Sequence, residues 1–389
     1  MTESLVLEKG EERFSRFALI GWWDQELLKR ARVLVVGAGA LGNELLKNLA
    51  LLGVGHVVVA DMDRIEKSNL SRSVLFREAD EGRFKAEVAA EAARSIYPDL
   101  RIRPVVGNVM AELGLGYFAW ADVVVGCLDN REARVFVNTA CAKTGKAWFD
   151  AGIEAMNGVV RGFEPPGTAC YECTMGQRDW DEIARRRSCS LLARQAQQQG
   201  ATPTTPTTAS VLGALQAQEL VKYLHRMDPE DVLLGKGFFF EGRRHTSYPI
   251  TYSVHPDCPW HEGAPGIERV LEFSSRTPLR EVWSYAQEKL GGLDALDLSR
   301  ELVERLECGS CGIAREVFVS VEKISAEQAV CSSCGQECGP SFFHSLCGGP
   351  HLDRTAAELG LPGWDVIWAR KEDEYLGIEL AGDRPGDLS

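Results

Sequence analysis

Hydrophobic and polar residues follow two different periods along the first 150 residues of the chain. Short apolar, mostly β-branched runs are typical of buried strands, and they occupy Arg32–Val36, His56–Ala60, Arg101–Val106 and Ala121–Gly126. Between them, apolar residues recur at helical spacing over Asn43–Leu52, Arg83–Ile96 and Arg131–Lys143. Strands that alternate with helices predict an α/β fold, with a doubly wound, Rossmann-like, mostly parallel sheet covered on both faces.

The pattern changes after Asp150. A Pro- and Thr-rich stretch, Ala201–Thr208, cannot continue a helix, and Ser210–Leu224 is helical again. Glycines near residues 263–266 suggest a boundary, so we expect one unit over residues 1–264 and a second over 265–389. The second unit is predicted to be α+β. Its expected elements are a helix opened and capped by Thr277-Pro278, β-structure at Ile313–Val321, a helix near Ala356 and a hairpin within Asp365–Leu380.

Composition narrows the class of protein. The net charge of −13 argues against a nucleic-acid partner, because phosphate backbones are bound by surplus Lys and Arg. An acidic surface suits basic protein partners, or serves solubility alone. The sequence has no signal-peptide pattern and no apolar run of membrane-spanning length, so we expect a cytoplasmic protein. Its 12 cysteines are then metal ligands, nucleophiles or core residues before they are disulfides.

A glycine-rich turn follows the first predicted strand. Gly37, Gly39 and Gly42 form a G-x-G-x-x-G motif at a strand–helix junction, where the backbone can approach a phosphate and the helix N-terminus favours its charge. Asp61 ends the next strand and can bind ribose hydroxyls. Alone, this motif fits a dinucleotide-dependent dehydrogenase as well as an ATP-binding enzyme.

The residues that follow favour ATP. Beyond Asp61 and Asp63, the chain supplies an amide at Asn69 and cations at Arg72 and Lys85. A developing pyrophosphate needs such neutralisation, whereas hydride transfer does not. Asp129 follows the predicted strand that ends at Gly126, at the sheet edge where ligands bind, and can hold the Mg²⁺ that accompanies ATP.

A series of motifs occurs in order along the chain: Arg13-Phe14-Ser15-Arg16, the glycine motif, Asp61-x-Asp63, Ser68-Asn69-Leu70-Ser71-Arg72, Lys85 and Asp129-Asn130. Together they resemble the adenylation fold of the ubiquitin-activating superfamily, which includes the bacterial MoeB and ThiF proteins. The resemblance covers roughly Arg13 to Ile250. It implies that Asp61 binds ribose, that Asn69, Arg72 and Lys85 bind phosphates, and that Asp129 holds magnesium. It also implies a homodimer in which Arg16 reaches the partner's ATP site.

Paired cysteines predict two structural zinc sites. The first combines Cys170 and Cys173 with Cys258 and His261; the second, of zinc-ribbon type, combines Cys308 and Cys311 with Cys331 and Cys334. Cys338 is close enough in sequence to compete with Cys334, and Cys347 has no assigned role. Cys127 and Cys141 are expected in the core.

Cys189 is the candidate nucleophile. It follows Arg185-Arg186-Arg187, whose charges favour a thiolate, and it precedes a segment that is longer than in sulfur-carrier activators. In the related family a cysteine at this position takes the activated carboxyl as a thioester or takes part in sulfur transfer. The resemblance therefore implies that the chain adenylates a β-grasp protein, forms a thioester on Cys189 and passes the acyl group to a conjugating partner.

Two other functions stay open at this point. The enzyme could stop at adenylation and supply a sulfur-carrier pathway, or the chain could be a nucleotide-binding scaffold without turnover. The C-terminal unit is either a partner-docking module or a stabilising appendage, depending on whether Trp364 and Trp368 are surface or core residues.

Overall fold

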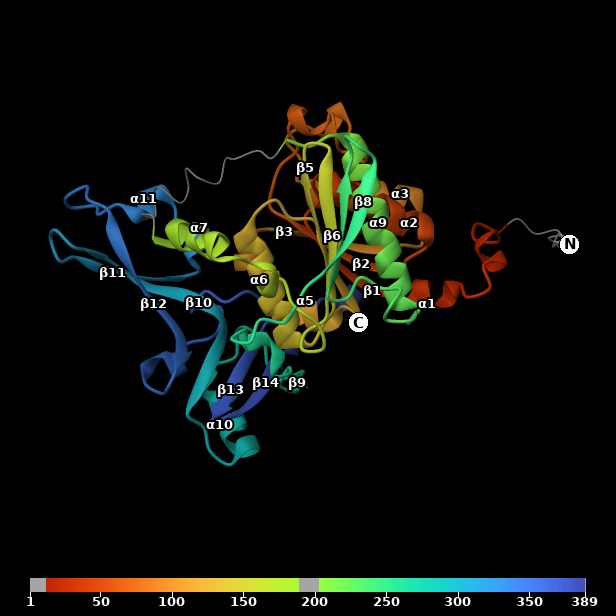
Figure 1. Ribbon diagram of the computed structural model, residues 1–389. Helices are drawn as coiled ribbons and strands as arrows, with labels where there is room; N and C mark the ends of the chain where they lie inside the picture. Colours follow the sequence, from red (N-terminus) through yellow and green to blue (C-terminus); the bar gives the residue numbers. More distant parts are fainter. Residues whose placement is uncertain (1–11, 189–202, 389) are drawn as a thin grey trace, which may run out of the picture.

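The computed structural model describes residues 12–188 and 203–388, and these residues build two β-sheets (Figure 1). The first sheet has the order β3-β2-β1-β4-β5-β6-β7-β8. Strands β3, β2, β1, β4 and β5 are parallel, and β6, β7 and β8 continue the sheet antiparallel. Its strands are β1 (Arg32–Val36), β2 (His56–Asp61), β3 (Arg101–Val106), β4 (Val123–Gly126), β5 (Trp148–Glu154), β6 (Asn157–Phe163), β7 (Lys236–Glu241) and β8 (Thr246–Thr251).

Helices cover both faces of this sheet because successive residues of β1 point to opposite sides. Val33 and Val35 pack with one group of helices, whereas Leu34 and Val36 pack with the other. The first group is α2 (Ala40–Leu52), α3 (Lys85–Ile96) and α9 (Pro206–Leu224). The second group is α4 (Val109–Glu112), α5 (Leu115–Trp120) and α6 (Arg131–Thr144). Two further helices are α1 (Gln25–Arg30) and α7 (Gln177–Ser188).

The second sheet has the order β11-β10-β13-β14-β9, and β12 also pairs with β10. Helix α10 (Leu279–Leu290) packs over it through Leu279, Val282 and Ala286. Its strands are β9 (Ile267–Val270), β10 (Ala295–Cys308), β11 (Ala314–Val319), β12 (Cys338–Leu346), β13 (Val366–Lys371) and β14 (Glu374–Leu380). A one-turn helix, α11 (Ala326–Ala329), lies between β11 and β12.

The C-terminal unit shares a core with the first sheet's helices. Trp364 is 1% exposed and packs with Phe118 and Trp120 of α5 in one hydrophobic cluster. The fit depends on small residues, because a Cβ on Gly116 would lie 2.4 Å from the indole. A buried Arg300 donates to the carbonyl oxygens of Met110 (2.7 Å) and Leu113 (2.8 Å), and Asp365 accepts from the Leu115 amide. The two units are therefore joined by both apolar and polar contacts.

The fold class predicted from the sequence is confirmed, with several local corrections. The segment near Ala356 is not a helix: a 3₁₀ turn, Pro350–Asp353, is followed by turns, and Gly360 adopts a φ of +88°. Helix α10 begins after Pro278, and its cap makes no side-chain hydrogen bond, so the predicted Thr277 cap is wrong; Thr277 instead accepts from the Ser274 amide. Trp364 and Trp368 are core residues. No helix among the described residues is long and apolar enough to cross a membrane.

Candidate functional site

The glycine turn lies between β1 and α2, and its three glycines serve different purposes. Gly37 has a φ of +102°, and a Cβ there would lie 2.3 Å from the Cys127 carbonyl oxygen. A Cβ on Gly42 would lie 2.1 Å from the Gly37 carbonyl oxygen, so both positions are closed by neighbouring backbone. A Cβ on Gly39, by contrast, would meet no atom within 4 Å. It is the N-cap of α2, which has neither a side-chain cap nor an acidic residue in its first turn, so this helix end is available to an anion.

Asp61 ends β2 beside this turn. Its Oδ2 accepts from the Ala38 amide (2.7 Å) and its Oδ1 accepts from the Asp63 amide (2.8 Å). Burial raises the pKa of the Asp61 carboxyl above its usual value, while these two amides and Lys85 oppose the shift. The carboxylate thus fixes the shape of the glycine turn, in addition to the ribose-binding role predicted for it.

The predicted phosphate ligands follow β2 in a short stretch of chain. Lys85 begins α3, is 12% exposed at its side chain and forms an ion pair with Asp63 (2.7 Å). Arg72 donates to the Ser68 carbonyl oxygen (2.7 Å). Asn69 is buried, and its Oδ1 accepts from the Glu66 amide (3.0 Å), so this side chain shapes the local backbone of the 3₁₀ helix Lys67–Asn69. All of these residues follow β2 at the carboxyl side of the sheet.

Asp129 follows β4, which is the direct neighbour of β1 on the side away from β2. The strand order therefore reverses between β1 and β4, which is where doubly wound sheets bind ligands. The Asp129 side chain is exposed and accepts from Asn130 Nδ2 (3.2 Å), whereas Asn130 Oδ1 caps α6 through the Ala133 amide (2.8 Å). An exposed carboxylate at the edge that carries the glycine turn fits a hard divalent cation such as Mg²⁺.

A buried ionic network lies behind Asp129, and sequence reasoning missed it. Asp150 in β5 is fully buried and pairs with Arg134 of α6 (2.8 Å) and with Arg161 of β6. Burial opposes ionisation of Asp150, but the two guanidinium groups hold the pKa of its carboxyl below the usual value. A signal was present in the sequence: Arg134 and Asn138 lie four apart on the face of α6 that also carries Val137 and Cys141, and polar residues among apolar ones at helical spacing often have buried partners.

The first predicted metal site is assembled. The ligand atoms of Cys170, Cys173, Cys258 and His261 lie within 4.8 Å of one another. The Sγ atoms of Cys170 and Cys258 are 3.6 Å apart, and those of Cys170 and Cys173 are 3.8 Å apart. Tetrahedral zinc with Zn–S bonds of about 2.3 Å places sulfur atoms about 3.8 Å apart, so the geometry fits zinc.

Surrounding groups orient these ligands. Asn138 Nδ2 lies 3.5 Å from the Cys170 sulfur, and the His255 amide donates to the Cys173 sulfur (3.3 Å). His261 Nε2 lies 3.1 Å from the Cys173 sulfur, while its Nδ1 lies 3.4 Å from the Pro166 carbonyl oxygen. Outer contacts of this kind fix the imidazole orientation at structural zinc sites.

The second predicted metal site is also assembled, in the C-terminal unit. Cys308, Cys311, Cys331 and Cys334 bring their sulfur atoms within 4.8 Å of one another. Each Cys-x-x-Cys pair is followed by a glycine in the left-handed region, Gly312 (φ +71°) and Gly335 (φ +73°). The amide of each glycine donates to the carbonyl oxygen of the first cysteine of its pair (2.9 Å). The two turns thus have the same construction, and both orient sulfur atoms toward a common point.

The remaining cysteines differ in exposure. Cys338 is buried in β12 opposite Cys308 but is outside the group of four, so Cys334 rather than Cys338 completes it. Cys127 and Cys141 are buried, as predicted, and burial raises the pKa of both thiols. Cys347 is exposed. Cys189, the predicted nucleophile, lies outside the described residues and directly follows α7, whose first turns are tied to α6 by an ion pair between Asp179 and Arg131 (3.0 Å).

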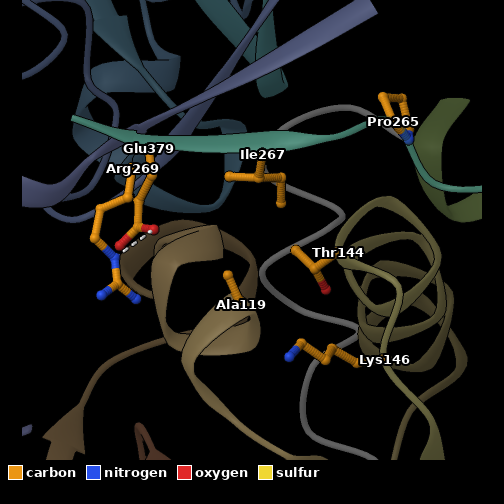
Figure 2. Close-up of a pocket in the computed structure, with 7 residues that line it drawn as sticks. All are labelled: Ala119, Thr144, Lys146, Pro265, Ile267, Arg269 and Glu379. Carbon is orange, nitrogen blue, oxygen red and sulfur yellow. Dashed lines mark hydrogen bonds and ion pairs between the residues drawn. The ribbon is translucent and has the colours of Figure 1, made fainter.

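A hollow of about 340 Å³ lies between the two units, away from the glycine turn (Figure 2). Ala119, Thr144 and Lys146 line it from the first unit, and Ile267, Arg269 and Glu379 from the second. Burial lowers the pKa of the Lys146 ammonium. Arg269 is paired with Glu379 (3.4 Å), whose other oxygen accepts from the Trp364 indole. This hollow is a seam of the interface between the units and contains none of the predicted site residues.

The glycine turn, the open N-terminus of α2 and the carboxylate at the β4 end define a nucleotide-binding enzyme of the doubly wound α/β class. The profile of the ThiF family matches residues 12–259, and the chain belongs to that family. The match leaves residues 260–389 outside the family domain.

Individual proteins support this assignment. The chain is 32% identical over 257 residues to the SAMP-activating enzyme E1 of Haloferax volcanii, an alignment that covers 64% of this chain and 87% of the relative. It is 31% identical to the sulfur carrier protein adenylyltransferase of Thermus thermophilus, covering 67% and 93% of the two chains. A crystal structure of E. coli MccB with AMPCPP and MccA shares the fold, with a TM-score of 0.53 and 23% identity over 64% of this chain and 74% of MccB. The chain is thus an ATP-dependent adenylyltransferase of the activating-enzyme type.

Proposed function

We propose that this chain activates the C-terminal carboxylate of a small β-grasp protein, of the ubiquitin-like or sulfur-carrier kind, by ATP-dependent adenylation. The observation that carries the proposal is the uncapped N-terminus of α2, which faces open space at Gly39 at the same sheet edge as Asp129. The relatives named for activating SAMP and sulfur carrier proteins support this substrate class.

In this proposal the chain acts by positioning and by neutralising charge. The amides of the glycine turn, together with Asn69, Arg72 and Lys85, hold the phosphates of ATP, and Asp61 holds its ribose. Asp129 would hold Mg²⁺, which would supply further neutralisation of the phosphate oxygens. An oxygen of the carrier's terminal carboxylate forms a bond to the α-phosphorus, the bond from that phosphorus to the bridging oxygen breaks, and pyrophosphate leaves.

A homodimer completes the site in this proposal. Arg16 is exposed, and Leu19, Ile20 and Trp22 expose apolar side chains just beyond it, with Trp22 51% exposed. An exposed apolar group of this kind next to a cation supports burial of the N-terminal segment against a second copy, with Arg16 reaching the partner's nucleotide.

The two cysteine-rich groups hold structural zinc in this proposal, because protein ligands fill four positions in each. The assembled geometry and the oriented outer contacts support it. Zinc would then hold together the loops around Cys170 and the two turns of the ribbon, and neither ion would have an open position for chemistry.

After adenylation, the Cys189 thiolate attacks the acyl carbon, AMP leaves, and the resulting thioester is passed to a conjugating partner. The three preceding arginines support a thiolate at this position. Since Trp364 and Trp368 lie in the core, it is charge that supports docking of that partner by the C-terminal unit. Over residues 265–389, Asp and Glu outnumber Lys and Arg by 22 to 12, so most of the chain's acidic excess lies there and suits a basic surface.

Pyrophosphate exchange tests the first step. With a β-grasp protein ending in Gly-Gly from the same genome, the wild-type chain should exchange pyrophosphate into ATP, and Asp129→Ala should lose most of this activity. Asp99→Ala, an exposed carboxylate before β3 at the opposite end of the sheet, is the matched control. Exchange that survives Asp129→Ala unchanged contradicts the assigned magnesium role.

The fate of the adenylate distinguishes the alternatives. A carrier thioester that is lost in Cys189→Ala and kept in Cys347→Ala, an exposed cysteine elsewhere, supports the thioester route. A thiocarboxylated carrier that forms without Cys189 supports the sulfur-carrier route. ATP binding with no exchange in the presence of such a carrier would contradict the proposed adenylation of a β-grasp protein.

A further inference from the structure

We infer that Arg134 is a positioning residue for Asp129: it clamps the loop that carries this carboxylate and so fixes it for magnesium-bound ATP. The inference rests on the proposed function, because it takes Asp129 as the residue that binds the cation. It assigns a role to a side chain that does not touch the nucleotide.

The contacts of Arg134 are divided between two segments. Its Nη2 donates to the carbonyl oxygen of Leu128 (2.5 Å), the residue before Asp129, and to that of Ala151 in β5 (3.1 Å). Its Nε donates to Asp150 (2.8 Å). One planar guanidinium therefore ties the β4–α6 loop to the neighbouring strand, which a single rotating ammonium group cannot reproduce.

Asp129 depends on this support. The hydrogen bond described for its own side chain is with Asn130, the next residue; the carboxylate is exposed, and beyond that bond it interacts with the Arg134 guanidinium through charge attraction. Asn130 is in turn the N-cap of α6, so the helix holds the loop from its far end. The clamp at Leu128 holds the near end. The orientation of Asp129 is thus set by backbone fixed on both sides rather than by contacts of the carboxylate.

The burial of the network argues that it has a purpose beyond stability. Arg134 and Asp150 are buried charges, and an apolar set of the same volume is often as stable as a buried ion pair. What an apolar set cannot do is donate to two carbonyl oxygens on different segments. The network also leaves one net positive charge behind the edge where phosphates would bind.

Arg161 provides a matched comparison. It pairs with the same Asp150 carboxylate from the other side, and its side chain is 16% exposed against 10% for Arg134. Its guanidinium also lies over the Tyr171 ring, and within the described part of the chain it makes no hydrogen bond to the Leu128 carbonyl oxygen. If the network serves stability alone, Arg134→Lys and Arg161→Lys should behave alike. If Arg134 positions the loop, only its replacement should affect the loop and the response to magnesium.

Two measurements on the full chain separate these cases. Hydrogen–deuterium exchange of the peptide spanning residues 127–131, without ligands, should speed up in Arg134→Lys and stay close to wild type in Arg161→Lys. The ratio of the ATP affinities measured with Mg²⁺ and with EDTA gives the gain in affinity that is due to the cation. That gain should fall by about tenfold in Arg134→Lys, the lower end of what outer contacts contribute at metal sites, and by less than about twofold in Arg161→Lys. The ratio cancels any general loss of binding-competent protein.

The outcomes are distinct. Equal effects of the two variants in both measurements overturn the inference and leave a purely stabilising network. An unchanged magnesium gain in Arg134→Lys overturns it as well. A wild-type chain that binds no ATP, or gains nothing from magnesium, overturns the proposed function instead. If Arg134→Lys does not fold, Arg134→Gln, which leaves Asp150 paired with Arg161 as a neutral pair, serves as the second variant in the same two measurements, with Arg161→Gln as its match.

Discussion

Replacing Gly39 with alanine separates the folding role of the glycine turn from its binding role. Gly39 has a φ of −71°, which other residues adopt, and a Cβ there meets no atom within 4 Å. The substitution loses a better N-cap residue but gains by restricting the unfolded chain, and each effect is about 1 kcal/mol or less. We therefore expect Gly39→Ala to change the free energy of unfolding by less than about 1 kcal/mol, which corresponds to at most about 2–4 °C in Tm for a chain larger than a small domain.

Binding should respond very differently. The added methyl group occupies the open space before the first amides of α2, where a phosphate oxygen would lie. Loss of one hydrogen bond to a charged group costs about 1.5–3 kcal/mol, so ATP affinity should fall by roughly 10- to 150-fold. Isothermal titration with ATP and Mg²⁺, together with thermal unfolding of the same samples, measures both quantities.

Two glycine variants serve as controls. Gly42→Ala places a Cβ 2.1 Å from the Gly37 carbonyl oxygen, so it should lower stability as overpacking does, by about 1–3 kcal/mol, and lose ATP binding as a consequence. Gly266→Ala, also in open space but just before β9, should change neither quantity. A Gly39→Ala chain that binds ATP like the wild type would refute the placement of phosphate at this turn.

Three further predictions concern the rest of the chain. Trp364→Ala should destabilise the protein by about 3–5 kcal/mol in urea unfolding followed by tryptophan fluorescence, because the buried indole packs against α5; a loss below 1 kcal/mol would mean that the two units fold independently. Cys334→Ser should remove about one zinc per chain by elemental mass spectrometry while Cys338→Ser removes none, and the reverse result would exchange the two ligands. The folded-state pKa of Asp150 is depressed, so its contribution to the free energy of unfolding is complete above the unfolded pKa of about 3.9 and is lost as the pH falls further. The difference in stability between wild type and Asp150→Asn should therefore be constant from pH 8 to 5 and narrow below about pH 4. A difference that widens on acidification contradicts this account.

The parallel core and the glycine turn could be predicted because they depend on local pattern. The runs at β1 and β2 are continuous apolar strands, and the glycine spacing marks the junction with α2 directly. Helix α7 could not be predicted because its sequence is strongly polar. Ile183 is the buried residue among its described side chains, so no apolar stripe marks the helix. The segment near Ala356 has buried apolar residues at helical spacing, but Gly360 and the following proline turn it back before a helix forms.

The candidate site divides in the same way. The metal ligands are readable because each pair lies close in sequence. A glycine follows Cys334 and Cys338 alike, so the sequence does not choose between these two cysteines; the structure does, because Gly335, with a φ of +73°, closes the Cys331–Cys334 turn. The Arg134–Asp150–Arg161 network joins a helix to two strands, so it depends on tertiary proximity that no sequence period encodes. Likewise, the burial of Trp364 depends on Gly114 and Gly116, which lie about 250 residues earlier in the sequence and leave room for it.

The central claim is that a carrier's terminal carboxylate is joined to AMP. Cys189→Ala should trap this product, because it blocks the next step without altering the residues around Gly39 and Asp129. Intact-mass spectrometry of the carrier, after incubation with this variant, ATP and Mg²⁺, should show a carrier heavier by one AMP, and a carrier with a C-terminal carboxamide should stay unmodified. A carboxamide carrier that is modified equally, or a free carrier that is never modified although the chain binds ATP, would contradict the account.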